Sequence, residues 1–200
     1  MRLCTLRLRP IYAAPSRGSS LGATGALMQG WALVEEGQAE EGVAQIRQGL
    51  AARRATGTEL YRPWFLALLA EAYGKVWQAA EGLVVLAEAL AVVDKTGERF
   101  WEAELHRLQG ELTLQSRGSG LPSTVEAEAE QCFHQALAVA RTQQAKSWEL
   151  RAATSLARLW HRQGKQEAAQ QLLGDIYGWF TEGFDTHDLR AAQALLEELR

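Results

Sequence analysis

Small and large apolar residues recur along this chain in a fixed order, at a spacing of about 40 residues that lengthens to 47 once. A large residue is followed nine positions later by a small one: Leu21 and Gly30, Tyr61 and Ala70, Trp101 and Gly110, Trp148 and Ala157. A small–large–small series at spacings of four and three comes next: Gly42, Ile46 and Gly49; Gly82, Leu86 and Ala89; Ala129, Phe133 and Ala136; Ala169, Leu173 and, less regularly, Ile176. A period of this length is typical of stacked-repeat proteins.

The spacing within each series predicts a pair of antiparallel helices in every unit. Residues three and four apart share one face of a helix. Small side chains on that face let two helices approach closely, and a large one fills the space between neighbouring pairs. We therefore expect helices over residues 21–36, 39–54, 63–75, 78–95, 99–115, 125–144, 147–163, 166–180 and 187–199.

These elements predict an all-α fold, a right-handed α-solenoid of about four helix-turn-helix pairs with a C-terminal capping helix. The third unit has about seven extra residues between its helices, and the Gly, Ser and Pro content of residues 116–123 predicts a surface loop there. Gly37 and Gly164 predict tight turns within the first and fourth pairs. In the second pair Trp77 stands near the place where a glycine is expected.

The positions of these small and large residues resemble those of the tetratricopeptide repeat (TPR). The shared features are a small residue late in the first helix, a small residue early in the second, and a large residue followed by a small one. The period of about 40 exceeds the usual 34, and Thr-Gly stands where the repeat commonly has proline. The resemblance covers residues 21–180 and implies a TPR-like helical repeat.

A narrower resemblance rests on four strings: GWALVEEGQAEEGVAQIRQGL (30–50), LALLAEAYGK (66–75), TGERFWEAELHRLQGEL (96–112) and YGWFTEGFDTHDL (177–189). They resemble the C-terminal helical region of large bacterial signalling proteins that carry a cyclase-like domain and an AAA-type ATPase domain ahead of it. This resemblance implies that the chain is a repeat portion of such a protein. The upstream ATPase or cyclase-like domains are then possible partners, and the nucleotide motifs belong to them.

The charge distribution separates the first residues from the rest. Residues 1–20 contain four arginines and no acid, which leaves −7 on residues 21–200 out of a total of −3. We expect residues 1–20 to be a basic, disordered tail or a misplaced translation start, with a targeting peptide as the alternative, and residues 21–200 to be the repeat domain. An acidic body argues against nucleic-acid binding. The absence of a long apolar run argues against a membrane span. The two cysteines, Cys4 and Cys132, lie far apart in sequence and have no metal-like spacing, which favours reduced thiols in the cytoplasm.

The sequence contains no arrangement of residues that predicts catalysis. The glycine-rich residues 18–25 lack the Lys-Ser/Thr of a phosphate-binding loop. The four histidines are never three or four residues apart, so they offer no paired metal site. Runs of glutamate are typical of a solvated helix face, with an acidic stripe for a basic peptide as the alternative. We therefore expect no enzyme, no cofactor and no bound metal. Most of the seven tryptophans are expected in the core, with an exposed subset that anchors a partner as the alternative.

The expected function is protein–protein interaction, because solenoids of this type present a concave surface lined by the first helix of each pair. Helical phase suggests seven partner-binding candidates there: Glu71, Lys75, Glu104, His106, Arg107, Arg151 and Arg158. The partner would be an extended or helical peptide or a partner domain. The alternative is a structural module that forms homo-oligomers by end-to-end stacking of repeats.

Overall fold

The computed structural model describes residues 20–116 and 123–200, which form nine helices and no strand. Their bounds are α1 Ser20–Glu35, α2 Ala39–Ala55, α3 Arg62–Lys75, α4 Ala79–Thr96, α5 Glu102–Ser116, α6 Ser123–Thr142, α7 Lys146–Arg162, α8 Gln166–Tyr177 and α9 His187–Glu198. All nine expected helices are present. The largest differences are that α5 begins three residues later and α8 ends three residues earlier, because short turn hydrogen bonds such as Glu102 N–H to Arg99 O and Phe180 N–H to Tyr177 O replace helical ones there.

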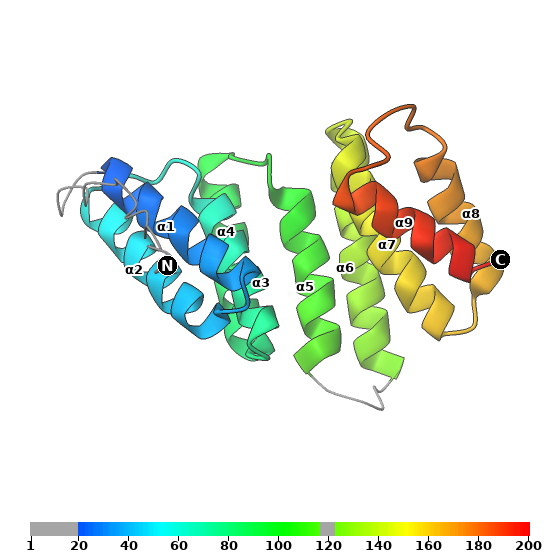
Figure 1. The fold of residues 1–200 in the computed structure, drawn as a ribbon, viewed down its shortest axis with the longest axis horizontal. Helices are drawn as coiled ribbons and strands as arrows, with labels where there is room; N and C mark the ends of the chain where they lie inside the picture. The colour runs from blue at the N-terminus through cyan, green and yellow to red at the C-terminus, as the bar shows by residue number, and fades with distance from the viewer. Residues whose placement is uncertain (1–19, 117–122) are drawn as a thin grey trace, which may run out of the picture.

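The helices follow one another as hairpins along the long axis of the molecule (Figure 1). We call α1, α3, α5 and α7 the A helices and α2, α4, α6 and α8 the B helices. Each A helix packs on its own B helix and on the next A helix. Successive B helices of the described part do not pack on one another in this way. Because α9 packs on α7 and α8, it takes the place of a fifth A helix. The predicted all-α TPR-like solenoid with a terminal capping helix is confirmed.

Small residues lie where the helices of a pair meet. A Cβ added to Gly42 would lie 2.5 Å from the backbone oxygen of Gly30, and one added to Gly82 would lie 3.2 Å from that of Ala70. The large residues between them, Ile46 and Leu86, are fully buried. Each such side chain contributes on the order of 1.5–3 kcal/mol through burial, so the core is built one hairpin at a time.

The turns use a left-handed backbone at regular places. Gly37, Gly97 and Gly164 have φ of 86°, 74° and 76°, which costs glycine little. Trp77 occupies the corresponding place in the second pair with φ 60°. The predicted glycine turns are confirmed, and the second pair makes the same turn with a tryptophan.

Some expectations concern parts of the chain that lie outside the described residues. These are the basic tail over residues 1–19, the side chain of Leu21, Cys4 and the centre of the loop at 117–122. The division at residue 20 therefore stays a prediction. Among the described helices, none has the length and apolar character needed to cross a membrane.

Candidate partner-binding groove

A groove with a volume of about 630 Å³ runs along the A helices and ends at the start of α9. We call it the A-helix groove. Its lining includes four tryptophans and six charged side chains: Trp31, Glu35, Trp64, Glu71, Lys75, Trp101, Glu104, Trp148, Arg151 and Asp188. Every A helix of the described part contributes to it, so the groove is a property of the repeat stack and not of one hairpin.

Helical spacing explains which residues reach the groove. On α3, Trp64, Leu68 and Glu71 follow one another at spacings of four and three, which keeps them on one face. Glu104 and Leu108 repeat the spacing of four on α5. Because A helices contact one another, these faces join into one surface.

Three tryptophans form a continuous row across the repeats. The rings of Trp64 and Trp101 are stacked with centroids 5.3 Å apart and planes 12° apart. Trp101 and Trp148 are also 5.3 Å apart, at 62°. Offset or edge-on pairs of this kind add about 0.5–1.5 kcal/mol beyond burial, and all three half-buried rings line the groove.

The expectation that most tryptophans lie in the core was wrong. None belongs to the buried core of the described residues, and Trp31, Trp77 and Trp179 are exposed. The interior between paired helices is filled by Leu, Ile and Phe among small residues, which leaves no space for an indole. The prediction that Trp101 and Trp148 pack between helices is confirmed by their ring contact.

A buried ion-pair network lies at one side of the groove. Glu104, only 5% exposed, accepts hydrogen bonds from Arg107 at 2.8 and 2.9 Å through its two oxygens, and Arg151 Nη2 lies 2.9 Å from its Oε1. Burial lowers the pKa of Arg107, but the charge of Glu104 and the hydrogen bonds with it raise that pKa above its usual value. The network joins α5 to α7 and holds Arg151 facing the groove.

A second ion pair connects equivalent positions of two repeats. Lys75 Nζ lies 2.5 Å from Glu35 Oε1, and the two residues are 40 apart in sequence. Gln115, another 40 residues on, donates a hydrogen bond of 2.8 Å to the backbone oxygen of Gly74. This edge of the A helices therefore carries a polar contact at the first two steps between repeats.

The groove as a whole is acidic. Four carboxylates line it against two cationic side chains, Lys75 and Arg151, both of which are already paired with a carboxylate. Glu71 is half-buried in the same lining, and its charge also helps to raise the pKa of Arg107. A cationic group that enters the groove meets these carboxylates, which attract it.

The structure places the seven predicted residues differently from one another. Glu71, Lys75, Glu104 and Arg151 line the groove together, and Arg107 contacts Glu104 from beside it. His106 faces away, because two residues along a helix rotate a side chain by roughly 200°. Exposed Arg158 lies on α7, two turns beyond Arg151 and outside the lining set. That any of them binds a partner stays a prediction.

Sequence reasoning named no particular tryptophan as a groove residue, and its list of seven candidates did not include Glu35 or Asp188. The spacing of Trp64, Leu68 and Glu71 was a usable signal, because it marks one face of α3. Asp188 had no such signal, since it reaches the groove only through the packing of α9 on α7.

Within the described residues, no cluster of three or more His, Cys, Asp or Glu side chains is arranged to hold a metal ion. Cys132 is a free, half-buried thiol, and burial together with the charge of Glu128 raises its pKa. A raised pKa leaves less of the reactive thiolate.

Two solved structures are similar to this chain along most of its length. They are a putative kinesin light chain of Podosopora anserina with nearly identical TPR-like repeats, and a variant of the same protein. Both have a TM-score of 0.66 and cover 90% of this chain, with 85% and 86% of their own length matched at 18–19% identity. The chain has a TPR-like fold.

At the level of sequence, an uncharacterized protein of Rhizobium meliloti (strain 1021) is 28% identical over 148 residues, which are 74% of this chain. The chain spans only 14% of the length of that relative. No protein-family model matches the chain.

Proposed function

We propose that this chain is a protein-interaction module that binds a basic peptide segment, extended or helical, in the A-helix groove. The observation that supports this most directly is the row of Trp64, Trp101 and Trp148 inside an acidic lining. Indole rings are enriched at binding hot spots. Lys or Arg side chains of a peptide would lie near Glu71, while its apolar side chains contact the indole rings, Leu68 and Leu108.

We further propose that the module works beside other domains, as the repeat portion of a bacterial signalling protein with ATPase or cyclase-like domains. The support is the resemblance of four strings of the sequence to such proteins, together with the Rhizobium relative, which is far longer than its matched region. The partner peptide then comes from those domains or from a downstream protein.

The test is to select peptides from a random library on the full chain and to titrate the selected peptides by tryptophan fluorescence. We expect the peptides to be rich in Lys or Arg. Trp101→Ala should weaken binding about 30-fold, the effect of one aromatic hot spot. Trp77→Ala is the control, because Trp77 lies in the α3–α4 turn outside the groove.

A milder pair of variants keeps the test valid if Trp101→Ala weakens the fold. Glu71→Gln should weaken binding about two- to fivefold, the effect of one accessible charge. The matched Glu81→Gln, on the exposed face of α4, should not. Selected peptides without basic residues, or equal losses in the paired variants, would contradict the proposal.

Self-association is the second candidate, and the exposed Trp179 and Phe184 near the C-terminal end of the stack favour it. Sedimentation velocity at several concentrations separates the two. A monomer at every concentration removes this candidate. Oligomers that persist on dilution and bind no peptide support it.

A further inference from the structure

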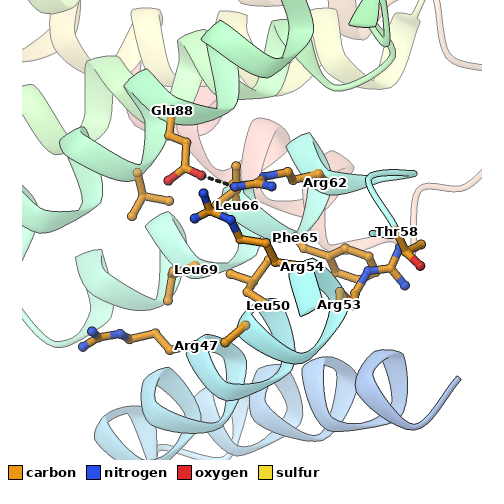
Figure 2. A pocket seen from close by; sticks show the side chains of 12 residues that line it. Arg47, Leu50, Arg53, Arg54, Thr58, Arg62, Phe65, Leu66, Leu69 and Glu88 are labelled. Atoms are coloured by element: carbon orange, nitrogen blue, oxygen red, sulfur yellow. Dashed lines mark hydrogen bonds and ion pairs between the residues drawn. The ribbon is translucent and has the colours of Figure 1, made fainter. Parts of the chain in front are cut away.

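A second pocket, with a volume of about 360 Å³, lies between α2, α3 and α4 (Figure 2). Its apolar wall includes Leu50, Phe65, Leu66 and Leu69. Phe65, Leu66 and Leu69 lie on the opposite face of α3 from Trp64, Leu68 and Glu71, as the helical period requires. The pocket is therefore separated from the A-helix groove by the body of α3.

Four arginines surround this apolar wall: Arg47, Arg53, Arg54 and Arg62. The acidic groups near them are Glu88, which lines the pocket, and Glu59, which pairs with Arg62 from the preceding loop. The pocket keeps an excess of positive charge in a chain whose net charge is −3.

Arg53 is the most deeply buried of the four, at 7% exposure. Its guanidinium donates hydrogen bonds of 2.7 Å to Thr24 Oγ1 and 2.6 Å to the backbone oxygen of Leu60, and lies 4.8 Å from the centre of the Phe65 ring. These partners are neutral, and no carboxylate of the described residues is within ion-pair distance of Arg53. A buried charge without a counter-charge is costly, so a nearby anion would be stabilised.

Arg62 has a buried N–H group that a ligand could satisfy. It is held by Glu59 at 2.7 Å and Glu88 at 2.5 Å, yet its Nε is buried without a hydrogen-bond partner among the described atoms. An unsatisfied buried donor costs about 1–3 kcal/mol. In the view of Figure 2, Arg54 extends toward the Arg62–Glu88 pair, while Arg47 extends away from it.

We propose that this pocket binds a small amphipathic anion, a phosphate or carboxylate group carried on an apolar or aromatic body. The arginine forks match the paired oxygens of either group. The body of the ligand would contact Phe65 and its aliphatic neighbours, which an inorganic ion cannot do. The site is independent of the peptide groove, so either can fail without the other.

The test uses phenyl phosphate, phenylacetate, inorganic phosphate and phenol, titrated into the full chain by calorimetry. We expect saturable binding of phenyl phosphate or phenylacetate, at least about tenfold tighter than inorganic phosphate because of apolar burial, and none of phenol. The stronger of the first two ligands identifies the anionic group.

Three substitutions locate the site. Glu88→Gln removes a carboxylate that competes for Arg62, so it should tighten binding about two- to fivefold. Arg54→Gln should weaken it by a similar factor. Arg158→Gln, an exposed arginine on α7, should leave it unchanged. A gain of affinity cannot arise from damage to the fold, which makes Glu88→Gln decisive. Unsaturable binding, unchanged or weaker binding in Glu88→Gln, or an equal effect of Arg158→Gln would overturn the proposal.

Discussion

Gly110 of α5 lies directly against the ring of Phe133 of α6. A Cβ added to Gly110 would be 2.5 Å from Phe133 Cε1 and 2.8 Å from Cδ1, distances that real Cβ atoms do not adopt. Phe133 is fully buried, and its small neighbours Ala129 and Ala136 are buried with it. The ring is therefore enclosed, and Gly110 provides the space that it fills.

Gly110→Ala should destabilise the protein by about 1–3 kcal/mol, because the ring or the helix must shift to make room. Gly174→Ala is the matched control, since Gly174 is also inside a helix but an added Cβ there would have no atom within 4 Å apart from its chain neighbours and the adjacent backbone of its own helix. That substitution should stabilise by up to about 1 kcal/mol through helix propensity. Urea denaturation of both variants measures the difference. Equal effects of the same sign would contradict this packing.

Trp77→Gly should stabilise the protein by about 1–2 kcal/mol, the cost of a left-handed backbone for a residue with a side chain. Trp77 has φ 60° and is 82% exposed, so little burial is lost when the ring is removed. Gly37→Ala, at the equivalent turn of the first pair with φ 86° and open space around it, should destabilise by a similar amount. Thermal melting measures both, and a lower melting temperature for Trp77→Gly would show that the exposed ring stabilises the turn.

The repeat could be predicted from sequence because side-chain volume determines how closely two helices pack. Gly30 and Gly42 are 12 residues apart, and they meet where the pattern of small residues places them. The same logic fails for long side chains. The direction of the Arg53 or Arg107 side chain depends on neighbours outside its own helix, such as Leu60 or Ser155, that a periodic pattern does not specify.

The residues that line the groove were also hard to predict, because they depend on contacts between different helices. Trp64 is not at the repeat position of Trp101 and Trp148, yet it stacks on Trp101 because successive A helices lie side by side. His106 shows the opposite case, because it lies on an A helix but does not line the groove. The pocket between α2 and α4 needed three helices from two hairpins and had no periodic signal.

His106 should make the stability of the protein depend on pH below neutrality. Burial lowers the pKa of His106. A hydrogen bond with Gln109 and the charges of Glu102 and Asp94 raise it, but burial is the larger effect, so the pKa is lowered overall. The unfolded chain then takes up a proton near its ordinary pKa of about 6.5, while the folded chain resists it. This contribution is present above that pH and is lost as the pH falls toward the lowered pKa.

The measurement is urea denaturation of the native chain and of His106→Gln at pH 7.5 and 5.5. We expect the free energy of unfolding to fall less between these values in the variant. His187→Gln, at the exposed start of α9, controls for the loss of any histidine. Identical pH dependence in the native chain and His106→Gln would contradict the assignment.

Glu104→Gln should destabilise the contact between α5 and α7 by about 1–3 kcal/mol, because two guanidinium groups lose their shared carboxylate. Arg107 keeps Glu111 at 3.4 Å, and Arg151 keeps Asp188 at 4.0 Å, which limits the loss. Arg158→Gln on the same face of α7 should stay within about 0.5 kcal/mol of the native chain.

The combined variant Glu104→Leu with Arg107→Met should recover part of that stability, since apolar side chains of similar volume can replace a buried pair. It also separates stability from binding. The variant also removes Glu104 from the groove lining, so it should weaken the binding of a basic peptide while its melting temperature returns toward that of the native chain. Unchanged melting of Glu104→Gln would mean that the network contributes no net stability to the stack.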